Sequence, residues 1–223
     1  MENASKVVFV AKLSARLFKE LYPKFASKEV VIYNGIKELG ETPSIVFDGT
    51  LRLVTVGTVN ERKNQIALVE SLKRVRDKGI DAYLTIVGGG KIDECKNLAS
   101  KLGITQYVEL TGPQDDVASI LNRCNIFIMS SFDEGLPISA IEALRSRLPL
   151  ILTDVGGNSE LIDGNGLLVH PTVDSLTNGI IQLSKDTPQL SKMSIRSYEI
   201  YKKSFTIESM IEGYARLANN IAK

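Results

Sequence analysis

Short runs rich in valine, isoleucine and leucine alternate along this chain with longer stretches that repeat apolar residues at helical spacing. The alternation constrains the fold strongly, because it is typical of a parallel sheet with helices on both faces. We therefore predict an α/β fold with a doubly wound, parallel, six-stranded sheet. The expected strands are Leu51–Gly57, Ala82–Val87, Tyr107–Leu110, Ile126–Met129, Leu150–Thr153 and Gly166–Val169.

Amphipathic stretches between and after these strands predict the helices that cover the sheet. Such sheets bind ligands at the carboxyl ends of their strands, so the loops that follow the strands are where chemistry is expected. The expected helices are Asn64–Asp77, Ile92–Lys101, Asp116–Arg123, Pro137–Ser146, Asn158–Ile162, Val173–Ser184, Pro188–Tyr201 and Thr206–Ala222.

The first 49 residues do not follow this pattern. Strands at Lys6–Val10 and Glu29–Tyr33 are expected to flank a helix at Ser14–Tyr22, which is too small a unit to bury its own apolar faces. We expect residues 1–49 to be the end of a preceding domain plus a linker, residues 50–205 the main domain and residues 206–223 a closing helix.

Charge and cysteine content exclude several classes of protein. The 27 Lys and Arg residues balance 26 Asp and Glu residues, so there is no general basic field to hold a nucleic acid. Cys95 and Cys124 lack zinc-ligand spacing, His170 is the only histidine, and both thiols are expected to be reduced and semi-buried. No apolar run is long enough for a leader or a membrane span. We expect a cytoplasmic protein, with at most peripheral contact at the inner face of the cytoplasmic membrane.

The segment from Ser130 to Ala143 carries the most informative pattern. It follows an expected strand and opens an expected helix, and Gly135 permits close approach of the backbone to a ligand. Free N–H groups and the positive helix end at such a start suit an anion such as a diphosphate. Glu134 and Glu142 flank it, and one carboxylate would suit a ribose diol and the other the hydroxyls of a sugar. The alternative is that both are ordinary solvated charges.

A second segment, Gly57 to Asn64, places Arg62 and Lys63 beside the same strand ends. Arg can bind phosphate oxygens with two parallel donors, and Lys adds a point charge, although a solvated basic pair is the alternative reading. The run Gly88-Gly89-Gly90 ends the next strand but lacks the spacing of a dinucleotide fingerprint, so alone it indicates only a tight turn.

Taken in order, these segments resemble the retaining glycosyltransferase family 4, whose C-terminal domain carries an E-x7-E motif. Glu134 and Glu142 match that motif, and Val54–Lys63 and Gly88–Gly90 match the strand and glycine loops that precede it. Val155–Ile162 matches the later Gly-Gly-x-x-Glu segment of the family. The resemblance runs from residue 51 to about residue 169. It implies the Rossmann-like C-terminal domain of a GT-B fold, preceded by a remnant of the N-terminal acceptor domain.

The resemblance also implies roles for individual residues. Arg62 and Lys63 would hold the donor diphosphate, Glu142 the nucleotide ribose and Glu134 the transferred sugar, with motif-helix amides along the phosphates. The residues expected to act in catalysis are Glu134, Arg62 and Lys63. The residues expected to bind the donor are Gly57, Arg62, Lys63, Gly88, Glu134, Gly135, Leu136, Ile138 and Glu142.

The implied reaction is transfer of a sugar from a nucleoside-diphosphate sugar with retention, in cell-envelope polysaccharide or lipopolysaccharide synthesis. Neither a cofactor nor a divalent metal is expected, and the acceptor would be a glycan or a lipid-linked glycan. One alternative is a non-catalytic nucleotide-sugar-binding subunit that needs a partner chain. A hydrolase using both carboxylates is a further alternative. We disfavour it, because the Arg-Lys pair and the glycine turns serve no purpose in hydrolysing a neutral glycoside.

The small N-terminal unit and three departures from the family pattern carry further expectations. We expect self-association through residues 6–33 or a separate acceptor-domain subunit, because strand edges without a flanking sheet should be left exposed. The apolar residues concerned are Val7, Val8, Phe9, Val30, Val31 and Ile32. Thr58 stands where many relatives have Arg, and Lys91 replaces a common Pro. Arg147 stands where a Gly usually ends the motif helix, so it must turn left-handed or end the helix differently.

Overall fold

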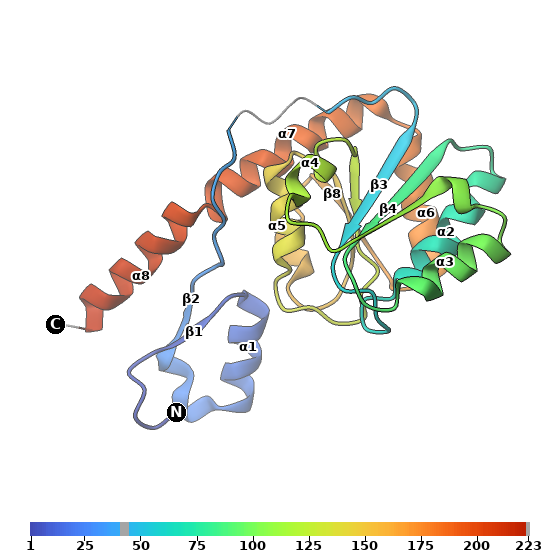
Figure 1. Cartoon of the computed structure of the whole chain (residues 1–223). Helices are drawn as coiled ribbons and strands as arrows, with labels where there is room; N and C mark the ends of the chain where they lie inside the picture. The colour runs from blue at the N-terminus through green and yellow to red at the C-terminus, as the bar shows by residue number, and fades with distance from the viewer. Residues whose placement is uncertain (41–44, 222–223) are drawn as a thin grey trace.

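A six-stranded, all-parallel sheet forms the centre of the molecule (Figure 1). The computed structural model describes residues 1–40 and 45–221. The strand order is β5-β4-β3-β6-β7-β8, which confirms the predicted doubly wound α/β fold. The strands are β3 (Leu51–Val56), β4 (Ala82–Val87), β5 (Val108–Gly112), β6 (Ile126–Ile128), β7 (Leu150–Thr153) and β8 (Gly166–Val169).

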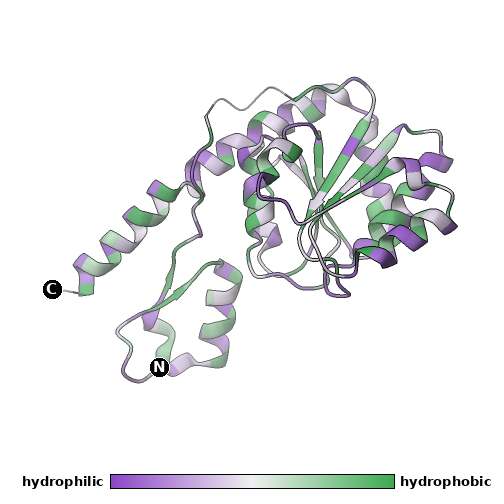
Figure 2. Ribbon diagram, viewed as in Figure 1, coloured by the Kyte–Doolittle hydropathy of each residue, from purple (hydrophilic) through white to green (hydrophobic). Residues whose placement is uncertain are grey.

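Helices cover both faces of the sheet and divide the apolar core in two. On one face lie α2 (Gln65–Asp77), α3 (Ile92–Lys101) and α6 (Val173–Ser184), and on the other lie α4 (Val117–Leu121) and α5 (Ile138–Arg145). The long helix α7 (Thr187–Ser204) joins the two cores, because Leu190 and Met193 pack with the first and Ile200 and Tyr201 with the second. Figure 2 shows the strands as mainly hydrophobic and the outer helix surfaces as mixed or hydrophilic.

The strand order creates a switch point between β3 and β6. These strands are hydrogen-bonded neighbours, with Leu53 opposite Ile126 and Val54 opposite Phe127. The helices that follow them, α2 and α5, pack on opposite faces of the sheet. The carboxyl ends of two such strands are where doubly wound sheets bind their ligands. The two sequence segments expected to bind a ligand both begin at these ends.

Some predicted helix bounds were wrong. The motif helix begins at Ile138 rather than at Pro137, because Pro137 has extended dihedrals (φ −71°, ψ 121°) and occupies the N-cap position. The expected helix Asn158–Ile162 is a single 3-10 turn, η3 (Asn158–Leu161), because Ile162 is already extended. The last helix is α8 (Ile207–Ile221), and the predicted end at Ala222 lies outside the described residues. A 3-10 turn, η2 (Thr105–Tyr107), delays β5 by one residue relative to the prediction.

The N-terminal unit, defined here as residues 1–33, is the predicted strand-helix-strand element. Strands β1 (Val7–Phe9) and β2 (Glu29–Val31) form a parallel pair around α1 (Lys12–Leu21), with a 3-10 turn, η1 (Pro23–Lys28), before β2. Helix α1 begins two residues earlier than predicted, because a carboxylate from the main domain caps its first two N–H groups. Residues 41–44 of the predicted linker lie outside the described residues.

Helix α8 crosses from the main domain to lie beside β2 (Figure 1). A Cβ on Gly213 would lie 3.0 Å from Ile32 Cγ2, and Ile32 is only 6% exposed. The expectation that Ile32 is left uncovered was therefore wrong, whereas the apolar residues of β1 and β2 are half-buried. The two crossing segments also pair, since Ile36 N–H donates to Phe205 O at 2.9 Å and Ile207 N–H donates to Ile36 O at 3.1 Å.

Both thiols are more deeply placed than predicted. Cys95 and Cys124 are buried and free, and burial raises the pKa of each to about 11. Such thiols are structural rather than reactive. Across residues 1–40 and 45–221, no helix combines the length and the apolar character needed to cross a membrane.

Candidate functional site

The loop between β3 and α2 is fixed by hydrogen bonds at both of its ends. Gly57 N–H donates to Val87 O at 2.9 Å, which joins the end of β3 to the end of β4. Near α2, Lys63 N–H donates to the Asn60 side-chain oxygen at 2.9 Å. The hydroxyl of Ser130, from the loop after β6, bonds the Lys63 carbonyl oxygen at 2.8 Å. The two loops at the switch point are therefore attached to each other.

Three of the predicted residues meet where these loops touch. Lys63 Nζ lies 2.5 Å from Glu134 Oε1, and Arg62 Nη1 lies 3.8 Å from Glu134 Oε2. Arg62 Nη1 also donates to Asp133 O at 2.7 Å. The Glu134 side chain is 6% exposed and the Lys63 side chain 15%, whereas Arg62 is 50% exposed. Glu134 is thus no solvated loop charge, and its charge is balanced by the two cations.

Glycines allow the neighbouring loops to approach this cluster. A Cβ on Gly88 would lie 2.2 Å from Gly57 O, so the two predicted glycines are in direct backbone contact. Gly156 has φ +54°, and a Cβ there would lie 1.6 Å from Glu134 O. Only glycine fits either position. The segment after β7, which contains Gly156, therefore packs directly against the loop that carries Glu134.

The start of α5 presents backbone donors next to the cluster. The first intrahelical bond runs from Ala140 N–H to Pro137 O at 3.2 Å, so the N–H groups of Ile138 and Ser139 precede the helical ladder. Ile138 is 41% exposed, whereas the Leu136 side chain is buried in the core and can offer a ligand only its backbone. Gly135, three residues before Ile138, is exposed, and N–H groups at a helix start are of the kind that can bind an anion.

Glu142 lies two turns along α5 and is not in contact with the cluster. It is half-buried, and burial raises its pKa, an effect that Arg145 partly offsets. In the described ranges 1–40 and 45–221, its carboxylate has no hydrogen-bond or ion-pair partner. A half-buried carboxylate without a partner is costly for folding, which is typical of a residue kept for a ligand.

Sequence reasoning missed the role of Glu160 and left that of Arg147 open. Arg147 takes the left-handed option (φ +63°), and its guanidinium lies 4.1 Å from the centre of the Tyr198 ring. Glu160 accepts hydrogen bonds from the N-terminal unit. Its position in the Gly-Gly-x-x-Glu segment is the sequence signal that could have drawn attention to it. Within the part of the chain that the structure describes, no group of three or more His, Cys, Asp or Glu side chains is arranged to hold a metal ion.

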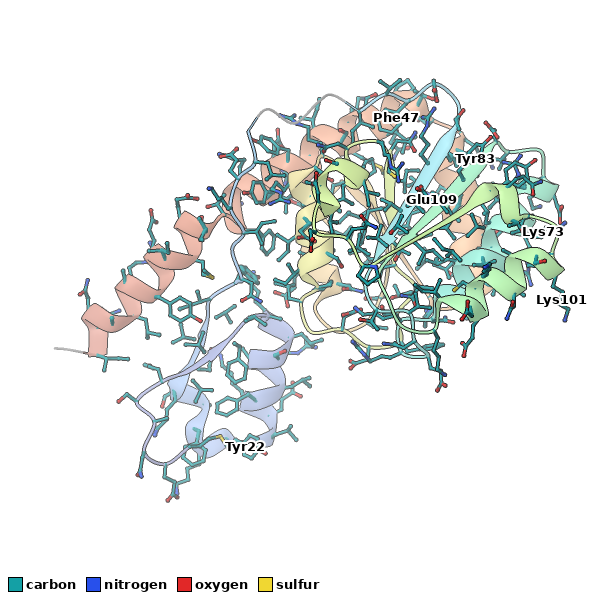
Figure 3. All side chains as sticks on the ribbon, in the orientation of Figure 1. Tyr22, Phe47, Lys73, Tyr83, Lys101 and Glu109 are labelled. Carbon is teal, nitrogen blue, oxygen red and sulfur yellow. The ribbon has the colours of Figure 1, made fainter. Side chains whose placement is uncertain are left out.

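A separate polar cavity of about 410 Å³ is lined by residues of β3, β4 and β5 and by Arg123 and Cys124, which follow α4. Figure 3 labels Tyr83 and Glu109, two of its lining residues. Thr50 and Asp81, which precede β3 and β4, also line it, so this cavity is at the opposite strand ends from the Glu134 cluster. Its arginines are already paired, Arg123 with Glu109 for instance, at 2.7 Å.

Solved structures of the same fold are glycosyltransferases of the GT-B type. The Anabaena protein HepE, solved in complex with UDP-glucose, superposes with a TM-score of 0.83 at 19% identity, over 97% of this chain and 64% of HepE. The description "Glycosyl transferases group 1" is that of the family model that matches residues 43–200. The chain belongs to this glycosyltransferase family.

Curated relatives agree with this assignment. The O-antigen biosynthesis glycosyltransferase WbnH of Escherichia coli is 32% identical over 65% of this chain and 41% of its own length. A UDP-Gal:alpha-D-GlcNAc-diphosphoundecaprenol alpha-1,3-galactosyltransferase of the same organism is 26% identical over 80% of this chain and 54% of its own. The chain therefore spans about half the length of these curated relatives.

Proposed function

We propose that this chain is the donor-binding part of a retaining glycosyltransferase of family 4, which transfers a sugar from a nucleoside-diphosphate sugar. The observation that carries the proposal is the meeting of Arg62 and Lys63, after β3, with Glu134, after β6, at the switch point of the sheet. Cations, a carboxylate and free helix amides at one strand-end crevice match the parts of such a donor.

Each part of the site has a chemical task in this proposal. Arg62, Lys63 and the N–H groups at the start of α5 hold the diphosphate, while Glu134 accepts hydrogen bonds from sugar hydroxyls. Glu142 accepts hydrogen bonds from the nucleotide ribose. The half-buried, partner-free state of Glu142 supports that role, because a diol would satisfy a carboxylate that no described residue satisfies.

The catalytic step is cleavage of the bond between the anomeric carbon of the sugar and the diphosphate oxygen. Negative charge grows on the leaving diphosphate as that bond breaks. The acceptor hydroxyl oxygen forms the new glycosidic bond on the same face, and its proton passes to the leaving diphosphate oxygen. Arg62, Lys63 and the α5 amides stabilise the growing charge more than the ground state, which lowers the barrier. We propose that these groups act without a divalent metal, and that chelator leaves donor binding unchanged.

The donor class and the process are drawn from the relatives. One of them is named for transfer from UDP-Gal and another for O-antigen synthesis. We therefore choose UDP and UDP-hexoses as the first ligands, and we propose a glycan or lipid-linked glycan of the cell envelope as the acceptor. The names of the relatives also favour an enzyme over a non-catalytic binding module.

Thermal melting of the chain with UDP, GDP, ADP and their sugars tests this function. A ligand at one hundred times its Kd stabilises by about 2.7 kcal/mol, which is several degrees for a protein of this size. Lys63→Ala should reduce the shift by about half or more, because a tenfold weaker Kd leaves only about 1.4 kcal/mol of that stabilisation. Lys101→Ala is the matched control, since Lys101 is an exposed cation at the end of α3, away from the switch point (Figure 3). No shift with any nucleotide at millimolar concentration would refute the donor site.

Turnover tests the catalytic part separately. Positioning two substrates contributes about 7–11 kcal/mol in favourable cases, and we propose that the acceptor is positioned by an N-terminal half. Transfer from a labelled UDP-hexose should be slow with this chain and increase when that half is supplied. An α-linked product from an α-linked donor indicates retention. Free sugar released from simple glycosides without nucleotide would favour the hydrolase reading.

A further inference from the structure

Glu160 connects the main domain to the N-terminal unit through three hydrogen bonds. Its carboxylate accepts from Lys12 N–H and Leu13 N–H, each at 3.0 Å, and from the Tyr33 hydroxyl at 2.8 Å. All three donors belong to the N-terminal unit, while Glu160 lies in η3 of the main domain. One side chain is therefore hydrogen-bonded both to the start of α1 and to Tyr33, which follows β2.

Helix α1 depends on this carboxylate for its start. Its N-cap residue, Ala11, has no side chain that can accept a hydrogen bond, so the first N–H groups of α1 have no cap from their own segment. Glu160 supplies both missing acceptors and places a negative charge at the positive end of the helix. Burial and the bond to Glu160 together raise the pKa of the Tyr33 hydroxyl, which is consistent with its donating to a carboxylate.

The segment that carries Glu160 also contacts the donor site. Gly157 N–H donates to Gly135 O at 2.7 Å, and a Cβ on Gly157 would lie 3.2 Å from Ala11 Cβ. Ala11 is fully buried at this junction. A continuous path of contacts thus runs from α1 through Ala11, Gly157 and Gly135 to the loop of Glu134.

The two parts also share apolar contacts, because Ala11 belongs to a core cluster of the main domain and Val10 and Tyr33 pack against it. Two chain segments cross between them, joined by the bonds of Ile36 with Phe205 and Ile207. Gly35 is packed tightly there, since a Cβ on it would lie 2.2 Å from Thr206 O. A movement of α1 away from η3 would break the bonds of Glu160 with Lys12 N–H and Leu13 N–H.

We propose that Glu160 is a positioning residue that fixes the N-terminal unit, and with it the start of α1, against the loop that carries Glu134. Its functional meaning rests on the proposed function: in the transferase it sets where the acceptor side stands relative to the donor sugar. Within residues 1–40 and 45–221, Glu160 forms no hydrogen bond or ion pair with Arg62, Lys63 or Glu134, so we do not count it as a catalytic residue.

Hydrogen–deuterium exchange of the full chain, with Glu160→Ala and Glu160→Gln, tests the proposal. In Glu160→Ala the first turn of α1 should exchange at least tenfold faster, while β3, β6 and α5 keep their protection. Glu160→Gln should give an intermediate rate, because its amide oxygen still accepts but carries no charge. Glu212→Ala is the matched control: Glu212 lies on α8 and forms an exposed ion pair with Arg216 of the same helix, so its loss should leave α1 unchanged.

A double-mutant cycle separates this specific role from general loosening. Tyr33→Phe should speed exchange of α1 in the wild-type background and add nothing in Glu160→Ala, because its hydroxyl acts through that carboxylate. Unchanged exchange in Glu160→Ala, or additive effects of the two substitutions, would overturn the proposal. UDP affinity measured on the same samples judges the donor site independently: failure of the wild type to bind UDP would refute the proposed function while the exchange rates still decide the role of Glu160.

Discussion

Removing the charge of Glu134 should tighten the binding of free UDP. In the ligand-free chain Lys63 Nζ is 2.5 Å from Glu134 Oε1, and both side chains are nearly buried, so Glu134 competes with a phosphate for the charge of Lys63. A charge-assisted hydrogen bond contributes about 1.5–3 kcal/mol, which corresponds to roughly ten- to hundredfold in affinity. Glu134→Gln should therefore lower the Kd of UDP by about tenfold or more. The role on the transferred sugar that the family resemblance implies for Glu134 predicts instead that loss of Glu134 spares diphosphate binding.

Isothermal titration calorimetry with UDP and UDP-hexoses measures this directly. The gain should be largest for UDP and smaller for UDP-hexoses, because Glu134 would also accept hydrogen bonds from the sugar. Asp133→Asn is the matched control: it removes a neighbouring charge whose side chain is exposed, while the backbone oxygen that Arg62 uses is kept. Unchanged or weaker UDP binding in Glu134→Gln, or an equal gain in Asp133→Asn, would refute the competition between Glu134 and phosphate for Lys63.

Three further outcomes are expected. Lys63→Ala should weaken UDP binding by roughly ten- to hundredfold in titration calorimetry while Lys101→Ala leaves it unchanged, since only the former can reach a phosphate. Glu142→Gln should raise the Tm of the ligand-free chain at pH 7 and lose that advantage in acid. Because the pKa of Glu142 is raised in the folded state, the protonated carboxyl stabilises the fold at pH values below the unfolded-state pKa. That stabilisation is lost as the pH rises through the folded-state pKa. Gly156→Ala should unfold the chain at lower denaturant concentration, because its Cβ would lie 1.6 Å from Glu134 O; an unchanged midpoint would contradict that contact.

The sequence was sufficient for the elements and for the main cluster. Alternating apolar runs predicted all six strands of the main sheet, and the spacing of Arg62, Lys63 and Glu134 relative to strand ends predicted that they lie at one edge. The order of the strands in the sheet could not be predicted from the sequence. The structure shows that β3 lies beside β6, which puts these residues at the switch point.

The periodicity of apolar residues in the sequence does not predict polar contacts between distant residues. Nothing in the local pattern around Glu160 indicates that it caps a helix about 150 residues earlier, or that it accepts a bond from Tyr33. The covering of Ile32 by α8 was missed for the same reason, because the contact depends on how the chain crosses back. The direct ion pair between Lys63 and Glu134 was missed because each residue was assigned to the ligand separately.

Our central proposal is that a nucleoside diphosphate binds at the carboxyl ends of β3 and β6. Titration of ¹⁵N-labelled chain with UDP, followed by amide chemical shifts, tests it most directly. The shifts should concentrate at Gly57, Arg62, Lys63, Gly135 and Ile138, and Lys63→Ala should weaken the UDP affinity that they report by roughly ten- to hundredfold. Shifts that cluster instead around the cavity of Tyr83 and Glu109 (Figure 3), at the opposite strand ends, would contradict it.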